Sequence, residues 1–138
     1  MDNIQRQVDN LGVPSCYDGA FLYFYALVLD GKPCLKPGIT EKNLSERINQ
    51  YLFREHLEQD KDMDFFVLLG VFRFSTRGKA GKAEGLIKES FKSFPLHTGQ
   101  HGNTEQYDFV PSWKYLRPSL KAEYIIGCEE AWVNPDFD

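Results

Sequence analysis

The chain has 138 residues, of which 42% are hydrophobic and 14% aromatic, which is enough for one well-packed domain. Its formal net charge of −4 excludes a protein that is basic overall and holds nucleic acid through net charge alone. Lys and Arg are nevertheless concentrated between residues 32 and 92, and the two ends are acidic. We therefore expect a cationic centre with acidic flanks.

The cysteines and the apolar segments indicate the cellular setting. Cys16, Cys34 and Cys128 are odd in number and form no C-x-x-C pair, so a zinc site or a disulfide framework is not expected. The N-terminal segment has no hydrophobic signal core, and the longest apolar run, 21–29, is too short for a membrane-spanning helix. We expect a cytoplasmic protein with reduced thiols and no membrane partner.

Hydrophobic periodicity and turn residues predict the elements. The first half contains a helix over 3–11 ended by Gly12 and Pro14, a buried strand over 21–29, a hairpin turn at Asp30–Gly31 and a short or edge strand over 34–39. A helix capped by Thr40 or Asn43 follows and fades by 60, and a strand over 64–74 leads into a glycine-rich basic loop over 76–81. The second half contains a helix over 80–94, a loop over 96–104, a short strand over 106–110 and a closing helix over 119–127.

These elements predict an α/β fold in which a small antiparallel or mixed sheet of about three strands is flanked by helices. We expect a single domain over 1–138, with a core at about 21–110 between an N-terminal helix and an acidic C-terminal extension. Leu44, Ile48, Tyr51 and Leu52 form the apolar stripe of the second helix.

Five residues carry the chemistry that we expect, namely Tyr25, Lys36, Gly38, Arg47 and Glu84. Phosphodiester hydrolysis needs an aligned water, a proton acceptor and cations that face the phosphate. A phenol next to a lysine, an arginine fork and a carboxylate that binds Mg²⁺ supply these parts. A glycine lets the backbone pass close to the substrate.

The order and spacing of these residues resemble the GIY-YIG nuclease family. The letters YFY, ending at Tyr25, stand where the family has GIY, and KPG, from Lys36 to Gly38, stands where it has YIG. The following helix carries Arg47 in the place of the family arginine, and AEGLIKESF resembles the helix of the metal-binding glutamate, here Glu84. Lysine in place of the second tyrosine is similar to a KIG-like subgroup. The resemblance covers about two thirds of the chain.

The resemblance implies a metal-dependent endonuclease that hydrolyses DNA with Mg²⁺ or Mn²⁺ bound at Glu84. It is similar to small stand-alone members from phages or mobile elements, which places its action in the host cell of a phage. Because one site cuts one strand, double-strand cleavage requires a homodimer or two binding events. Further substrate contacts are expected from Gly38 and from a set that comprises Arg77, Lys79, Lys82, Asn103 and Glu105.

Several alternatives remain at this point. Tyr23 shares its strand face with Tyr25 and is the catalytic phenol if the strand register differs. Arg47 and Glu84 also suit ordinary surface ion pairs and helix charges. The rival functions are a non-catalytic nucleic-acid-binding module on the same fold and an acidic protein-interaction or inhibitor module. For the nuclease we expect Tyr25, Lys36, Arg47 and Glu84 to line one cleft. Glu84 on the opposite face of the sheet from Tyr25 would contradict the catalytic interpretation.

Overall fold

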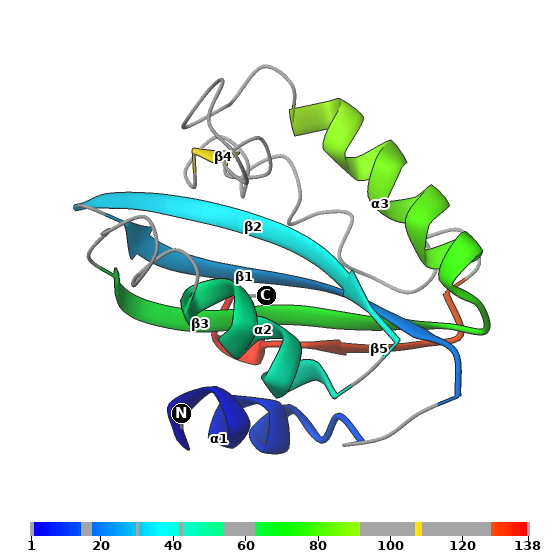
Figure 1. Cartoon of the computed structure of the whole chain (residues 1–138), viewed down its shortest axis with the longest axis horizontal. Coiled ribbons are helices and arrows are strands. Elements are labelled where there is room, and N and C mark those ends of the chain that lie inside the picture. Colours follow the sequence, from blue (N-terminus) through cyan, green and yellow to red (C-terminus); the bar gives the residue numbers. More distant parts are fainter. Residues whose placement is uncertain are drawn as a thin grey trace.

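Helices and strands follow one another along the chain in an α/β arrangement (Figure 1). The computed structural model describes residues 2–14, 18–29, 31–41, 43–53, 63–91, 107–108 and 128–137. Its elements are α1 (Asp2–Leu11), β1 (Ala20–Leu29), β2 (Lys32–Thr40), α2 (Leu44–Phe53), β3 (Met63–Phe74), α3 (Arg77–Phe91), β4 (Tyr107–Asp108), β5 (Glu130–Val133) and the 3-10 turn η5 (Pro135–Phe137).

The strands form one antiparallel sheet in the order β4-β2-β1-β3-β5. The three predicted strands of the sheet are present as β2-β1-β3, and the short strand predicted over 106–110 is present as β4. Among the described residues, β5 is the strand that was not predicted from the sequence. The outer strand β5 lies in the segment that the sequence presents as an acidic extension. The acidic residues of this segment allow it to pair with β3, because Glu129 and Glu130 form ion pairs with Arg73 of β3 at 3.4 and 3.3 Å.

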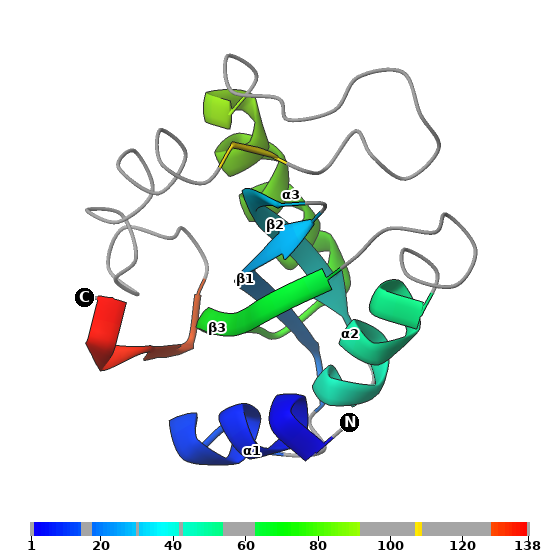
Figure 2. The ribbon, with the colours of Figure 1, turned by 90° about the vertical axis from the view of Figure 1, so that its left-hand side faces the viewer.

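The alternation of side chains along β1 builds two separate cores. Phe21, Tyr23, Tyr25 and Leu27 lie in the cluster that includes α1 and α2. The intervening residues, Ala20, Leu22 and Phe24, lie in a second cluster that includes Ala80 and Ala83 of α3. Helix α3 therefore covers one face of the sheet, and α1 and α2 cover the other (Figure 2).

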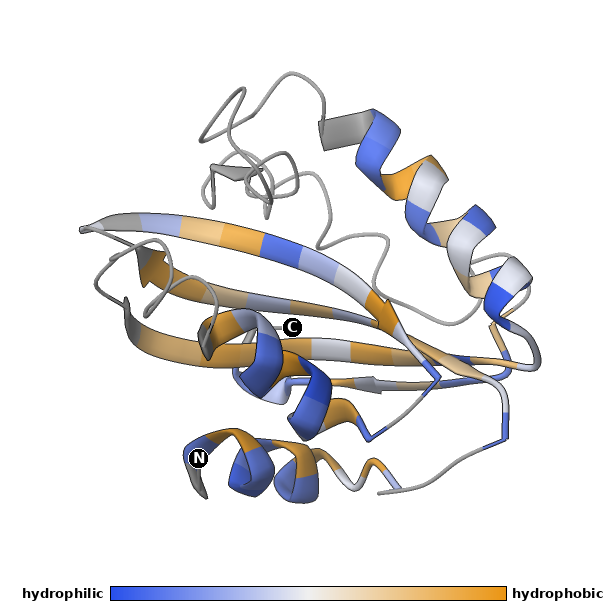
Figure 3. Ribbon diagram, in the orientation of Figure 1, coloured by the Kyte–Doolittle hydropathy of each residue, from blue (hydrophilic) through white to orange (hydrophobic). Residues whose placement is uncertain are grey.

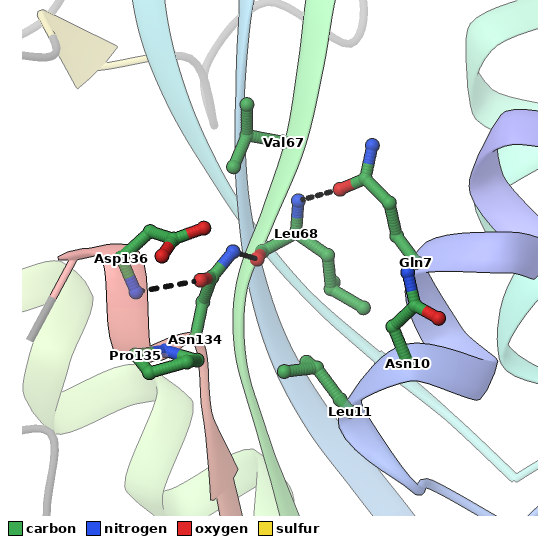
Figure 4. Close-up of a pocket in the computed structure, with 8 residues that line it drawn as sticks. All are labelled: Gln7, Asn10, Leu11, Val67, Leu68, Asn134, Pro135 and Asp136. Atoms are coloured by element: carbon green, nitrogen blue, oxygen red, sulfur yellow. Dashed lines mark hydrogen bonds between the residues drawn. The ribbon is translucent and has the colours of Figure 1, made fainter.

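Helix α1 is amphipathic and turns its hydrophobic side towards the sheet (Figure 3). Its end matches the prediction, because Gly12 adopts a positive φ of 83° and Val13 N–H donates to the carbonyl of Val8 at 3.3 Å. Gln7 accepts a hydrogen bond from Leu68 N–H at 2.7 Å (Figure 4). It also donates to the carbonyl of Phe66 at 2.9 Å. The side-chain amide of Gln7 therefore satisfies two backbone groups at the edge of β3, outside the part that pairs with β5.

Strand β2 is longer than predicted, although it contains two prolines. Strand β4 pairs only with Cys34 and Leu35 of β2. In the part of the chain that the structure describes, β2 therefore has an open edge from Lys36 to Thr40. Proline lacks the N–H that a second neighbour would need, so Pro37 is tolerated at this edge, as the sequence predicts. The open edge is where the candidate site lies.

The two helices beside this edge start at polar caps. Asn43 caps α2, since its side-chain oxygen accepts from Glu46 N–H at 3.0 Å. Thr76 caps α3 by accepting from Lys79 N–H at 3.2 Å. The predicted basic loop over 76–81 is therefore wrong, because this cap starts the helix at Arg77 despite the glycines that follow. The basic residues Arg77 and Lys79 belong to the first turn of α3.

Cys34 is buried, and partial burial raises the pKa of the Cys128 thiol. Cys16 and the predicted closing helix over 119–127 lie outside the described residues. None of the described helices combines the length and the apolar character needed to cross a membrane.

Candidate functional site

A pocket of about 200 Å³ lies along the open edge of β2, where residues of α2 and α3 meet residues of the sheet. Most of its lining side chains are polar or charged, and they come from four elements. The lining residues are Tyr23 of β1, Lys36, Gly38 and Ile39 of β2, Arg47 and Tyr51 of α2, and Arg77 and Glu84 of α3. Tyr23 and Glu84, which are 61 positions apart in the chain, thus line the same pocket.

The pocket reaches around the edge of the sheet instead of lying on one face. Lys36 is paired with Tyr25 of β1 and so shares the face that α2 covers. Helix α3 packs on the opposite face through Ala80 and Ala83. The prediction that Glu84 belongs to the same sheet face as Tyr25 is therefore wrong, and the observed arrangement is the one that the sequence-based interpretation sets against a catalytic role. Glu84 nevertheless joins Lys36 and Arg47 in the pocket lining, because no partner strand covers the described edge of β2 at that point.

Of the two candidate phenols, the pocket includes Tyr23 and not Tyr25. Tyr25 is 1% exposed and its ring packs against Phe66, with ring centroids 5.1 Å apart. Tyr23 stacks on Tyr25 at 6.0 Å and pairs across the hairpin with Gly38. Tyr25 therefore supports the ring that lines the pocket. The prediction that Tyr25 lines the cleft is therefore wrong, and Tyr23, the alternative phenol, lies in its place.

Gly38 provides the space that the Tyr23 ring occupies. A Cβ atom at position 38 would lie 2.5 Å from the Tyr23 hydroxyl oxygen and 2.6 Å from the adjoining ring carbon. Both distances are far below van der Waals contact. Glycine is needed here for close approach, and its backbone angle is not the reason, since Gly38 is not among the glycines with positive φ. The glycine of the predicted motif thus fixes the position of the tyrosine.

Lys36 is a buried cation that lies against an aromatic ring. The residue is 6% exposed, and its Nζ lies 4.6 Å from the centroid of the Tyr51 ring. This distance is within the range of a cation–π interaction, which stabilises an ammonium group that has lost hydration. Tyr51 was not among the predicted site residues, because it was assigned to the apolar stripe of α2. Its spacing of four from Arg47 would have placed both on one helix face.

Two arginines contribute from opposite sides of the pocket. Arg47 comes from the first half of α2 and is exposed. Arg77 comes from the first turn of α3 and forms an exposed ion pair with Glu41 at 3.4 Å. Lys36, Arg47 and Arg77 give the lining three cationic groups. The arrangement suits an anion with several oxygens, because guanidinium groups donate in a planar fork.

Glu84 is the carboxylate of the pocket lining. Its side chain is 13% exposed and forms an ion pair with Lys88 at 3.4 Å. The described residues contain no group of three or more His, Cys, Asp or Glu side chains arranged to hold a metal. A single carboxylate offers a hard cation such as Mg²⁺ or Mn²⁺ one oxygen ligand, and the three neighbouring cations keep this binding weak until a phosphate and waters supply further oxygens. Glu84 thus fits a metal that binds together with its substrate.

The remaining predicted contacts lie away from the pocket or outside the described residues. Lys79 and Lys82 are exposed on α3, and Lys79 donates to the Ser75 hydroxyl at 3.0 Å. Neither residue lines the pocket. Asn103 and Glu105 lie outside the described residues.

None of three comparisons, with models of protein families, with curated proteins and with solved structures, finds a match to this chain.

Replacement of Gly38 by alanine tests the contact between the hairpin strands. We expect Gly38→Ala to lower the free energy of unfolding by about 1–3 kcal/mol, because the Tyr23 ring must leave its place. The matched control is Gly85→Ala on α3, where an added Cβ meets nothing within 4 Å. This control should raise stability by up to about 1 kcal/mol, since alanine is the better helix former. Equal effects of both changes in urea unfolding would contradict the close contact.

Proposed function

We propose that this protein is a metal-dependent endonuclease of the GIY-YIG type that hydrolyses phosphodiester bonds in DNA. One observation carries the proposal: Lys36, Gly38, Arg47 and Glu84, which were selected from sequence, line a single pocket together with Tyr23, the alternative to the selected Tyr25. The residue types in this pocket match the needs of phosphodiester hydrolysis, which are a proton acceptor, cations for the phosphate and a carboxylate for a metal.

The cationic side of the pocket would bind the scissile phosphate. The guanidinium of Arg47 can donate two parallel hydrogen bonds to phosphate oxygens. Lys36 adds a charge that is little screened by solvent, because its side chain is buried. Arg77 can turn from Glu41 to a neighbouring phosphate, since both partners of that pair are exposed and such pairs are weak.

Tyr23 would take the proton of the attacking water. In the reaction the water oxygen bonds to phosphorus, the bond to the leaving sugar oxygen breaks, one proton of the attacking water passes to the phenolate of Tyr23, and a solvent water protonates the leaving oxygen. One DNA end keeps the phosphate, and the other ends in a hydroxyl group. Lys36 favours the phenolate form through its positive charge. This role moves from Tyr25 to Tyr23 because of the pocket lining.

Glu84 would hold the metal ion. Bound Mg²⁺ would stabilise the negative charge that develops on the leaving oxygen. The protein's own part is to keep one carboxylate near the phosphate, on the side of the pocket that α3 provides. We place the protein in the cytoplasm, including that of a phage host, and two copies or two encounters would cut both strands.

Replacement of Glu84 by glutamine tests the assignment. We expect Glu84→Gln to abolish cleavage of supercoiled plasmid in Mg²⁺ while DNA affinity stays nearly unchanged, because only the metal-holding charge is lost. Arg47→Ala should weaken both DNA binding and cleavage, since a guanidinium contacts phosphate before and during the reaction.

The matched control is Glu89→Gln, an exposed glutamate on the same helix, which should cut plasmid like the natural protein. A mock preparation from cells without the protein accounts for contaminating nuclease. Full cleavage by Glu84→Gln would contradict the metal assignment and, with it, the nuclease proposal in this form.

Salt titration separates the nuclease from the acidic interaction module. With about three or four phosphate contacts, DNA affinity should fall roughly 40- to 150-fold for a fourfold increase in salt. Sequence should matter little, because the cations of the pocket suit phosphates and not base edges. Fluorescence anisotropy with two unrelated duplexes measures both properties. A flat salt response would instead favour binding to a protein partner.

A further inference from the structure

Glu84 has a neighbour that the proposed reaction does not use. Its Oε1 lies 3.4 Å from Nζ of Lys88, one helical turn further along α3. The carboxylate is 13% exposed and the lysine side chain is 25% exposed. A glutamate four residues before a lysine is the favoured orientation for such a pair on a helix. Because the carboxylate is largely removed from water, a nearby positive charge stabilises it.

A divalent cation at Glu84 would compete with this ammonium group. Both bind the same carboxylate, and two positive groups at one oxygen repel each other strongly where solvent is largely excluded. Lys88 is not among the pocket-lining residues, so it approaches Glu84 along the helix surface. Its flexible stem allows the ammonium group to turn away into solvent or towards an added anion.

From this geometry we infer that Lys88 is the resident counterion of Glu84 and keeps the divalent-metal affinity of the DNA-free protein low. A phosphate in the pocket would attract the displaced ammonium and supply oxygens to the metal, so metal and DNA would bind cooperatively. Lys88 is thus a positioning residue that couples metal uptake to substrate. The inference rests on the proposed function, because it takes Glu84 as the metal ligand.

Binding of Mn²⁺ alone tests this coupling without any cleavage. The electron paramagnetic resonance signal of free Mn²⁺ reports how much ion the protein has bound. We expect Lys88→Met to bind Mn²⁺ about five- to tenfold more tightly than the natural protein, because the competing charge is gone. Lys88→Arg should remain as weak as the natural protein. The double variant Glu84→Gln with Lys88→Met should lose the binding that Lys88→Met gained.

The charge-matched control is Lys82→Met, on the same helix but only two residues from Glu84 and therefore on another side. It should leave Mn²⁺ affinity unchanged. Circular dichroism verifies folding, and Lys88→Gln provides a second variant with a polar end group. Unchanged affinity in both Lys88→Met and Lys88→Gln, or an equal gain in Lys82→Met, would overturn the inference.

The two proposals fail in different ways. If the natural protein cuts plasmid but Lys88→Met binds Mn²⁺ no more tightly, the coupling by Lys88 is refuted and the nuclease stands. If Lys88→Met binds Mn²⁺ more tightly through Glu84 but no DNA is cut by the natural protein, the coupling is supported and the nuclease is refuted.

Discussion

The pairing of β1 with β2 is the constraint on which the site depends. It sets Tyr23 opposite Gly38 and Tyr25 opposite Lys36. Side chains of directly opposed residues lie on the same face of an antiparallel pair, so all four belong to one face. Because Gly38 has no Cβ atom, the ring of Tyr23 can lie against its backbone in the same pocket as Lys36. A shift of β2 by one residue against β1 would turn Lys36 and Gly38 to the face opposite Tyr23 and Tyr25.

The position of the pocket along β2 determines which helices contribute to this set. In the described residues, β4 pairs with β2 only as far as Leu35. Residues of β2 from Lys36 onwards line the pocket. Helices from both faces of the sheet therefore contribute side chains there, Arg47 from α2 and Glu84 from α3. The site combines the buried cation of Lys36, the exposed guanidinium of Arg47 and the largely buried carboxylate of Glu84. Such a mixture suits a phosphate that arrives from solvent and a metal that arrives with it.

The sequence predicted local features well and spatial choices less well. The hairpin at Gly31, the end of α1 at Gly12 and the Asn43 cap follow from residues close together in the chain, so their prediction succeeded. Strand β5 was missed because its pairing partner β3 lies about 60 residues away and its acidic residues need Arg73. Likewise, periodicity puts Tyr23 and Tyr25 on one face but cannot tell which ring meets the pocket. Packing of Tyr25 against Phe66 and Tyr51 decides that choice.

The comparison of two conservative variants, Tyr23→Phe and Tyr25→Phe, tests the central claim most directly. Each removes one hydroxyl group from neighbouring stacked rings of the same strand, so differences in folding are small and circular dichroism can verify them. The measurement is the initial rate of plasmid cleavage in Mg²⁺. The account predicts that Tyr23→Phe loses about 100-fold or more of the rate, as expected for a general base, and that Tyr25→Phe stays within about threefold of the natural protein. Loss of cleavage in Tyr25→Phe with full activity in Tyr23→Phe would contradict it.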